Sequence, residues 1–225
     1  HLEWSDPIDD DFSYYNIYRE YEYVGNSMQP EFHDASFFYG QSTSYSVEAV
    51  DNNGNISETS LPVEVDLAKT LNINVHSGAN LASFHILHED NALNNVFADA
   101  GTNLSNIIGE GVAATQISPG EWVGSLSEIK RQSGYWLKVE TDADFNIPGY
   151  QSEPTLTYEL QEGYNLISFP LPWEVDISSS IPDAVEPSFL DIIGEGVAAT
   201  NLGDGNWVGS LSNLEGTFGY WVKVS

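Results

Sequence analysis

A tandem duplication constrains this chain more than any other feature. The segment IIGEGVAAT occupies residues 107–115 and recurs at residues 192–200, an offset of 85 residues (192 minus 107). The same offset aligns two further motifs, WVGSLS (122–127 with 207–212) and GYW (134–136 with 219–221). Because no gap is needed, the sequence predicts two copies of one folded unit in succession.

We expect the two copies to be homologous β-rich domains over residues 71–150 and 156–225. Each has a strand-like start, a second apolar segment, a variable middle, the GEG turn and a closing GYW strand. The strand-like starts are LNINV in the first copy and LTYEL in the second. The second copy stops at Ser225 without a counterpart of DFNIPG, so we expect it to be C-terminally incomplete.

Local patterns within the copies predict strands and short helices. Side chains alternate in GYWLKV, as they do in a half-buried strand. The variable middle NALNNVFADA favours a short helix, whereas Pro182 and Pro187 disfavour a long one in the second copy. Short linkers are expected at about residues 66–70 and 141–155.

Residues 1–66 read as short alternating strands separated by turn-rich gaps. The motifs HLEWSDP, YYNIYRE, SYSVEAVDNNGNISETS and VEV resemble the later part of a bacterial fibronectin type III module. The resemblance implies that Trp4 is the core tryptophan of the second strand, that Tyr45 lies on the sixth, and that residues 51–55 turn into the last. The first of about seven strands is missing. Either the chain begins inside the module or a strand comes from elsewhere.

The repeated unit, with openings like GYNLISFP and closings like GYWVKV, is similar to β-rich repeats of large secreted and surface proteins of environmental bacteria. That resemblance implies a location and an architecture, and no particular reaction. The expected fold class is mainly β: a partial fibronectin type III-like β-sandwich over residues 1–66 and two tandem homologous β-rich domains.

Charge and composition limit the partners. Six Lys and Arg against 34 Asp and Glu give a formal net charge of −28. This excess opposes attraction to phosphate backbones and anionic lipid, so we expect no nucleic-acid partner and no membrane insertion. The chain has no cysteine, which excludes disulfides and thiolate metal sites. An acidic surface is typical of extracellular or cell-surface proteins.

Gly109, Gly111 and Ala114 spell GxGxxA, and the second copy repeats the pattern. A dinucleotide site with this fingerprint needs a helix after the glycines and room for phosphate charge. Glu110 lies within the loop, and the chain is strongly acidic. We therefore favour a glycine turn that lets two strands or a ligand approach closely.

His85 and His88 suggest a metal pair, but positions three apart on a strand face opposite sides. The second copy has Pro170 and Trp173 at these positions, so the shared unit does not depend on the histidines. No GxSxG elbow surrounds any serine, and the 34 acids offer too many pairs to single out a catalytic one. We expect no enzyme activity and no catalytic residue.

Clustered carboxylates are the candidate metal ligands. Asp9, Asp10 and Asp11 lie in one short loop, and Asp142 and Asp144 lie in another. Hard oxygen ligands favour Ca²⁺, although neither segment has the spacing of an EF-hand loop. The alternatives are calcium at one of these places or a solvated acidic loop with no cofactor.

Aromatic side chains are the candidate partner-binding residues. We expect Trp122 and Trp207 in the cores, whereas Trp136 and Trp221 are candidates for glycan or partner contacts. The middle segments 85–106 and 170–191 differ most between the copies, which makes them the first candidates for specific recognition.

The sequence favours a non-catalytic extracellular segment of a larger secreted or surface protein, acting as a stalk, an adhesin or an assembly region. Its expected partners are other modules of the same polypeptide or assembly, glycans, or other surface proteins. The alternative is a carbohydrate-binding or accessory region of a secreted hydrolase.

Overall fold

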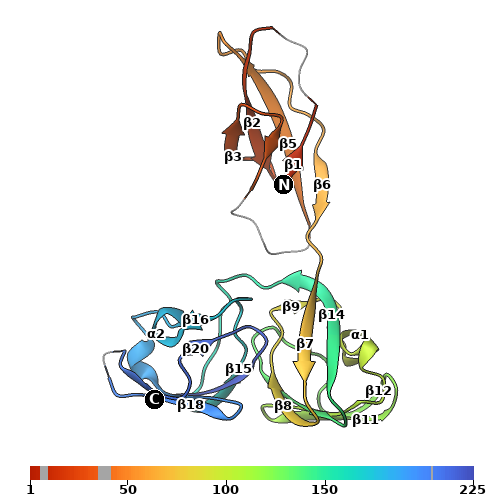
Figure 1. The fold of residues 1–225 in the computed structure, drawn as a ribbon, viewed down its shortest axis with the longest axis vertical. Coiled ribbons are helices and arrows are strands. Elements are labelled where there is room, and N and C mark those ends of the chain that lie inside the picture. The colour runs from red at the N-terminus through yellow and green to blue at the C-terminus, as the bar shows by residue number, and fades with distance from the viewer. Residues whose placement is uncertain (6–9, 35–41, 204) are drawn as a thin grey trace. The chain divides into compact units, whose positions relative to one another are not determined.

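The computed structural model describes residues 1–5, 10–34, 42–203 and 205–225. The chain forms two compact units, His1–Ala68 and Lys69–Ser225 (Figure 1). As predicted from the alternating patterns, the fold is mainly β. Among the described residues, no helix has both the length and the apolar character needed to cross a bilayer.

The first unit contains two sheets. One pairs two short strands, β1 and β4, and the other has the order β3-β2-β5-β6. The strands are β1 (Leu2–Glu3), β2 (Phe12–Arg19), β3 (Glu22–Ser27), β4 (Glu31–Phe32), β5 (Ser42–Asp51) and β6 (Val63–Asp66).

Tyr15, Ile17 and Tyr45 form the buried core of the first unit. The Trp4 ring packs edge-on against Tyr15, with ring centroids 5.0 Å apart. The Tyr45 hydroxyl donates to Asp34 Oδ2 at 2.8 Å, and the Arg19 guanidinium donates to the same oxygen at 2.6 Å. Burial, more than this carboxylate, raises the pKa of Tyr45 to about 12.

The second unit holds both copies of the repeat. The elements of the first copy are β7 (Lys69–Val75), β8 (Gly78–Ala82), β9 (Ile86–Leu87), α1 (Leu93–Val96), η1 (Ala98–Ala100), β10 (Leu104–Gly109), β11 (Val112–Ser118), β12 (Glu121–Gly124), β13 (Tyr135–Val139) and β14 (Ala143–Gln151). Those of the second are β15 (Gly163–Ile167), β16 (Val175–Asp176), α2 (Ile177–Ser180), η2 (Glu186–Ser188), β17 (Phe189–Gly194), β18 (Val197–Asn201), β19 (Trp207–Gly209), β20 (Asn213–Leu214) and β21 (Tyr220–Val224).

The main sheets of the two copies have the same strand order. It is β12-β11-β10-β13-β8 in the first copy and β19-β18-β17-β21-β15 in the second. In both, the closing GYW strand lies between the first strand of the sheet and the strand that precedes the GEG turn. The short helix expected in NALNNVFADA is present as α1, and the proline-containing middle of the second copy forms only α2 and η2.

Two expectations about strands and linkers are wrong. In the first copy LNINV lies on β7, which pairs with β14. LTYEL, at residues 156–160, lies in no strand, because no segment of the described chain pairs with it as β14 pairs with β7. The linker predicted at 141–155 is mostly strand, since Ala143–Gln151 is β14 and also pairs with β9.

Each copy buries its own hydrophobic cluster. Tyr135 and Tyr220 are 2% and 3% exposed at equivalent positions of the closing strands. Trp122 and Trp207, which we expected in the cores, are partly buried and pack against the clusters of their copies.

Candidate binding site between the two copies

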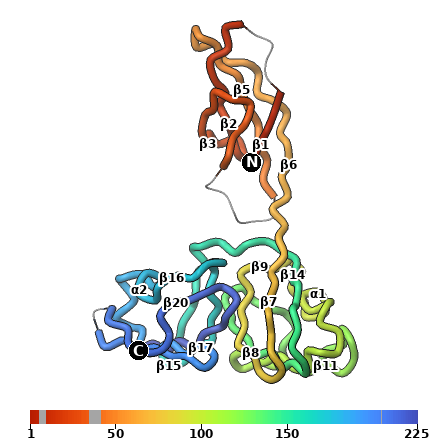
Figure 2. The backbone as a smooth tube through the Cα atoms, viewed as in Figure 1, coloured from red at the N-terminus to blue at the C-terminus, as the bar shows by residue number. Residues whose placement is uncertain are grey.

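The two copies meet along the edge strands of their main sheets. An edge strand leaves backbone N–H and C=O groups without partners, so it must be covered or it invites aggregation. Strand β8 is one edge of the first sheet, opposite β12, and β15 is one edge of the second, opposite β19. The two copies lie side by side, and each covers the edge of the other (Figure 2).

The backbone hydrogen bonds across this contact are reciprocal. Gly219 N–H donates to the Leu81 carbonyl at 3.0 Å, and Gly134 N–H donates to the Leu166 carbonyl at 3.2 Å. In each pair the first residue belongs to GYW of one copy and the second to the edge strand of the other.

A second pair of backbone bonds repeats the pattern. Ser83 N–H donates to the Thr217 carbonyl at 3.0 Å, and Ser168 N–H donates to the Gln132 carbonyl at 3.1 Å. All these partners are related by the 85-residue offset of the duplication. The contact is therefore self-complementary, like the interface of a two-fold symmetric dimer, but it lies within one chain.

The glycines of GYW make this close approach possible. A Cβ added at Gly134 would lie 2.8 Å from the Ile167 carbonyl oxygen and 3.2 Å from the Gly219 Cα. A Cβ added at Gly219 would lie 2.9 Å from the Ala82 carbonyl oxygen. Any larger residue would push the copies apart.

The GEG turns reach across the same contact. Glu195 Oε2 accepts from Leu81 N–H at 2.7 Å, and Glu110 Oε2 accepts from Leu166 N–H at 2.9 Å. Each turn joins two antiparallel strands, with Gly111 and Gly196 at φ +70°. A strand follows the glycines where a dinucleotide site would need a helix, so the turn interpretation is confirmed.

Two cavities flank the contact, one on each side. The larger has a volume of about 750 Å³ and the smaller about 250 Å³. Every residue that lines the smaller cavity has its counterpart, 85 positions away, in the lining of the larger one. The shared lining comes from the GEG turn, the SLS segment, the tyrosine of GYW and the edge-strand leucine. The cavities are therefore a property of the repeat.

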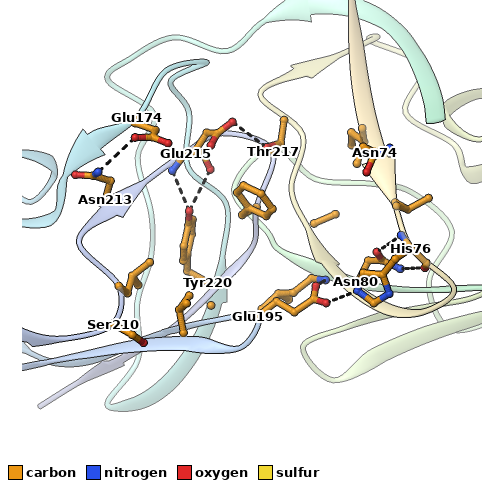
Figure 3. A pocket seen from close by; sticks show the side chains of 18 of the residues that line it. Asn74, His76, Asn80, Glu174, Glu195, Ser210, Asn213, Glu215, Thr217 and Tyr220 are labelled. Carbon is orange, nitrogen blue, oxygen red and sulfur yellow. Dashed lines mark hydrogen bonds and ion pairs between the residues drawn. The ribbon is translucent and has the colours of Figure 1, made fainter. Parts of the chain in front are cut away.

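The larger cavity is closed on one side by β7, which has no strand counterpart in the second copy. Asn74, His76 and Asn80 of the first copy face Glu174, Glu215 and Tyr220 of the second across it (Figure 3). Asn72 and Asn74 are exposed on β7, because their neighbours Leu71, Ile73 and Val75 point into the core of the first copy.

Glu195 connects the two walls at one end of the cavity. Its Oε1 lies 2.6 Å from His76 Nε2, while Oε2 accepts from Leu81 N–H (Figure 3). The hydrogen bond to the Ser77 carbonyl and the nearby Glu195 carboxylate raise the pKa of His76. The second copy has Gln161 in place of His76, so this ion pair belongs to the larger cavity alone.

The remaining polar groups of the larger cavity are also held by neighbours. Glu174 Oε2 accepts from the Asn213 amide at 3.3 Å, and Glu215 Oε1 accepts from the Thr217 hydroxyl at 3.4 Å. The Tyr220 hydroxyl accepts from Glu215 N–H at 2.9 Å, and burial raises the pKa of Tyr220 to about 12. Among the described lining residues, no serine or threonine hydroxyl is hydrogen-bonded to a histidine.

The two groups of calcium candidates belong to different units of the chain. Asp9 lies outside the described residues, and Asp10 and Asp11 lie in the turn before β2. Asp142 Oδ1 accepts from Ser77 N–H at 2.7 Å, and Asp144 Oδ1 accepts from the Asn74 amide at 2.9 Å. Within the described part of the chain, none of these residues belongs to a group of three or more potential metal ligands.

One group of potential ligands was not anticipated from the sequence. His1, Glu3 and Glu31 come together because Glu3 pairs with Glu31 across β1 and β4. His1 Nε2 lies 3.0 Å from Glu3 Oε1 and 3.6 Å from Glu31 Oε2. All three are exposed, as in an ordinary surface ion pair.

Trp136 and Trp221 are half-buried, and neither is among the residues that line the two cavities between the copies. Each stands opposite an exposed isoleucine of the neighbouring strand, Ile108 or Ile193, on the outer face of its sheet. The middle segments 85–106 and 170–191 contribute a single residue, Glu174, to the larger cavity. The site is thus built mainly from the frame that the copies share.

The two histidines considered as a metal pair have separate roles. His85 is buried and its Nδ1 donates to the Gly216 carbonyl at 2.9 Å, while burial lowers its pKa. His88 is exposed, and its Nδ1 accepts from Asp90 N–H at 3.0 Å. His85 therefore strengthens the contact between the copies.

Sequence reasoning missed the role of Glu110 and Glu195. The signal in the sequence was that both GEG turns keep a glutamate. The turn itself requires only its second glycine, so the glutamate needs another explanation. No protein-family model matches this chain, and no curated protein and no solved structure matches it either.

Proposed function

We propose that this chain is a non-catalytic structural segment of a larger extracellular or cell-surface protein, acting as a stalk, an adhesin or an assembly region. Its second unit works as one double repeat, in which the copies cover each other's sheet edges. The observation that carries the proposal is the reciprocal set of contacts between β8, β15, the GEG turns and the GYW glycines. A spacer that must resist extension gains from such mutual coverage, because β8 and β15 are not left as free edges.

The first unit supports the same proposal. It is a fibronectin type III-like module in our interpretation, supported by its two sheets and by the partly buried Trp4, which packs against the buried cluster of Tyr15 and Tyr45. Tyr45 lies on the fifth strand of the unit, which becomes the sixth if a first strand is missing. Modules of this kind commonly serve as spacers in cell-surface proteins.

The partners in this proposal are other modules of the same polypeptide or assembly. The net charge of −28 supports a solvated surface and disfavours nucleic acid and anionic membranes. No cofactor enters the proposed mechanism, which is mechanical. Hydrolysis of peptides or glycosides by the purified chain at an enzymatic rate would contradict it.

Pulling the chain from its two ends in a single-molecule force experiment tests the proposal. Lys69–Ser225 should unfold in one event that releases about 500 Å of extended chain. The Gly134→Val and Gly219→Val variants should split this event in two, because each added side chain clashes with the other copy.

The matched control is Gln132→Val, which places a valine at an exposed position just before Gly134 and leaves in place the backbone carbonyl that accepts from Ser168 N–H. It should leave the single event unchanged. Two independent unfolding events in the unsubstituted chain would show that the copies are separate spacers, and would overturn the double-repeat mechanism.

A further inference from the structure

The larger cavity differs from the smaller one in lining side chains that the pairing of the copies does not require. Asn213, Glu215 and Phe218 line it where the smaller cavity has Glu128, Lys130 and Ser133. The hydrogen bonds across the contact use backbone groups at or near these positions, so they place no demand on the side chains. The pairing of the copies therefore does not fix the identity of these side chains.

The volume of the larger cavity, about 750 Å³, falls within the range of small-molecule sites. The smaller cavity, at about 250 Å³, does not. The difference comes largely from the exposed Asn72, Asn74 and His76 on and beside β7, which form a wall that only the larger cavity has.

The electrostatics exclude anionic ligands. Three glutamates, Glu174, Glu195 and Glu215, line the larger cavity, and no Lys or Arg lies among its lining residues. Each carboxylate already accepts from a neighbouring donor: the Asn213 amide, His76 with Leu81 N–H, and the Thr217 hydroxyl, respectively. The lining therefore contains both acceptors and donors.

A lining with both donors and acceptors matches hydroxyl groups, because each hydroxyl both donates and accepts. Phe218 adds an apolar surface, since its side chain is 47% exposed although its backbone is held at the contact. An exposed aromatic ring can pack on the C–H face of a sugar ring while carboxylates and amides bind its hydroxyls.

We propose that the larger cavity between the copies is a binding site for a short neutral oligosaccharide, with Phe218 as the stacking platform and Glu174 and Asn213 as hydroxyl ligands. The site lies away from Trp136 and Trp221. It adds recognition to a structural segment and does not depend on the mechanical role, because the side-chain hydrogen bond of Glu174 and Asn213 lies within the second copy and Phe218 contributes only its backbone to the contact.

The test uses the full chain on an array of neutral hexose and N-acetylhexosamine oligosaccharides, followed by calorimetric titration of the strongest binder. Phe218→Ser, which installs the residue type of the smaller cavity, should weaken binding at least tenfold. Glu174→Gln should also weaken binding. Because it changes an exposed side chain, it keeps the test valid if Phe218→Ser folds poorly.

The matched controls are Glu128→Gln in the smaller cavity and Trp136→Ala on the outer face, and both should bind as the unsubstituted chain does. Absence of binding to every neutral glycan would overturn the proposal, as would binding of basic peptides alone. Binding that survives Phe218→Ser and Glu174→Gln but is lost in Trp136→Ala would also overturn it. None of these outcomes alters the expected single unfolding event, so the two proposals can fail separately.

Discussion

Side chains at equivalent positions of the two copies can differ in the hydrogen bonds that they make. Trp122 and Trp207 occupy the same place in the two copies and pack on their cores. Trp207 Nε1 donates to Glu186 Oε1 at 2.8 Å, and Glu186 is only 7% exposed. Trp122 Nε1 is buried without a hydrogen-bond partner among the described residues. The second copy therefore depends on a polar bond that the first copy lacks.

Replacing each tryptophan by phenylalanine measures this difference. Trp207→Phe should cost about 1–3 kcal/mol more than Trp122→Phe, because it leaves a buried carboxylate without its donor. Trp122→Phe removes an already unsatisfied N–H and serves as the matched control for lost ring area. Urea unfolding of the two variants gives the comparison. Equal costs would mean that the Glu186 bond contributes nothing to stability.

At the scale of elements, the GEG hairpins act as clamps on the opposing edge strands. Glu195→Ala and Glu110→Ala each remove the acceptor of one edge-strand amide, Leu81 N–H or Leu166 N–H. Each substitution should cost about 1–3 kcal/mol, the usual cost of leaving a desolvated donor unpaired. Only the Glu195 clamp also contacts a titratable group, His76.

The two clamps should therefore respond differently to pH. The pKa of His76 is raised in the folded chain from its ordinary value of 6.5, by the Ser77 carbonyl first and then by Glu195. Its contribution to stability is fully present below pH 6.5 and is lost as pH rises through the folded pKa. Thermal unfolding between about pH 5 and pH 9 should show Glu195→Ala costing more than Glu110→Ala only at the acidic end. A difference that grows with pH would contradict this account.

The elements also show what the sequence could predict. The strands of each copy follow from short-range alternation, which the duplication presents twice, and α1 follows from the composition of its segment. The pairing of β14 with β7 could not be predicted, because it joins segments about 70 residues apart through backbone groups that carry no sequence signature. For the same reason residues 156–160 resemble a strand in sequence but lack a partner strand among the described residues.

At the scale of the whole molecule, the duplication explains more than the presence of two similar sheets. The sequence motifs retained in both copies, GEG and GYW, are those that join one copy to the other. Sequence alone predicts two neighbouring domains, since a repeat pattern does not reveal which surfaces its members share. The candidate site was missed for the same reason, because its residues converge only when the copies pair.

Amide hydrogen exchange at Leu81 and Leu166, measured by NMR in the full chain, tests the pairing of the copies most directly. Both amides lie on edge strands, and each is bonded only to a glutamate of the other copy. They should be protected as strongly as amides of the central strand β13, and to a similar degree as each other. Rapid exchange at both positions, as in an uncovered sheet edge, would show that the two copies do not join into one unit.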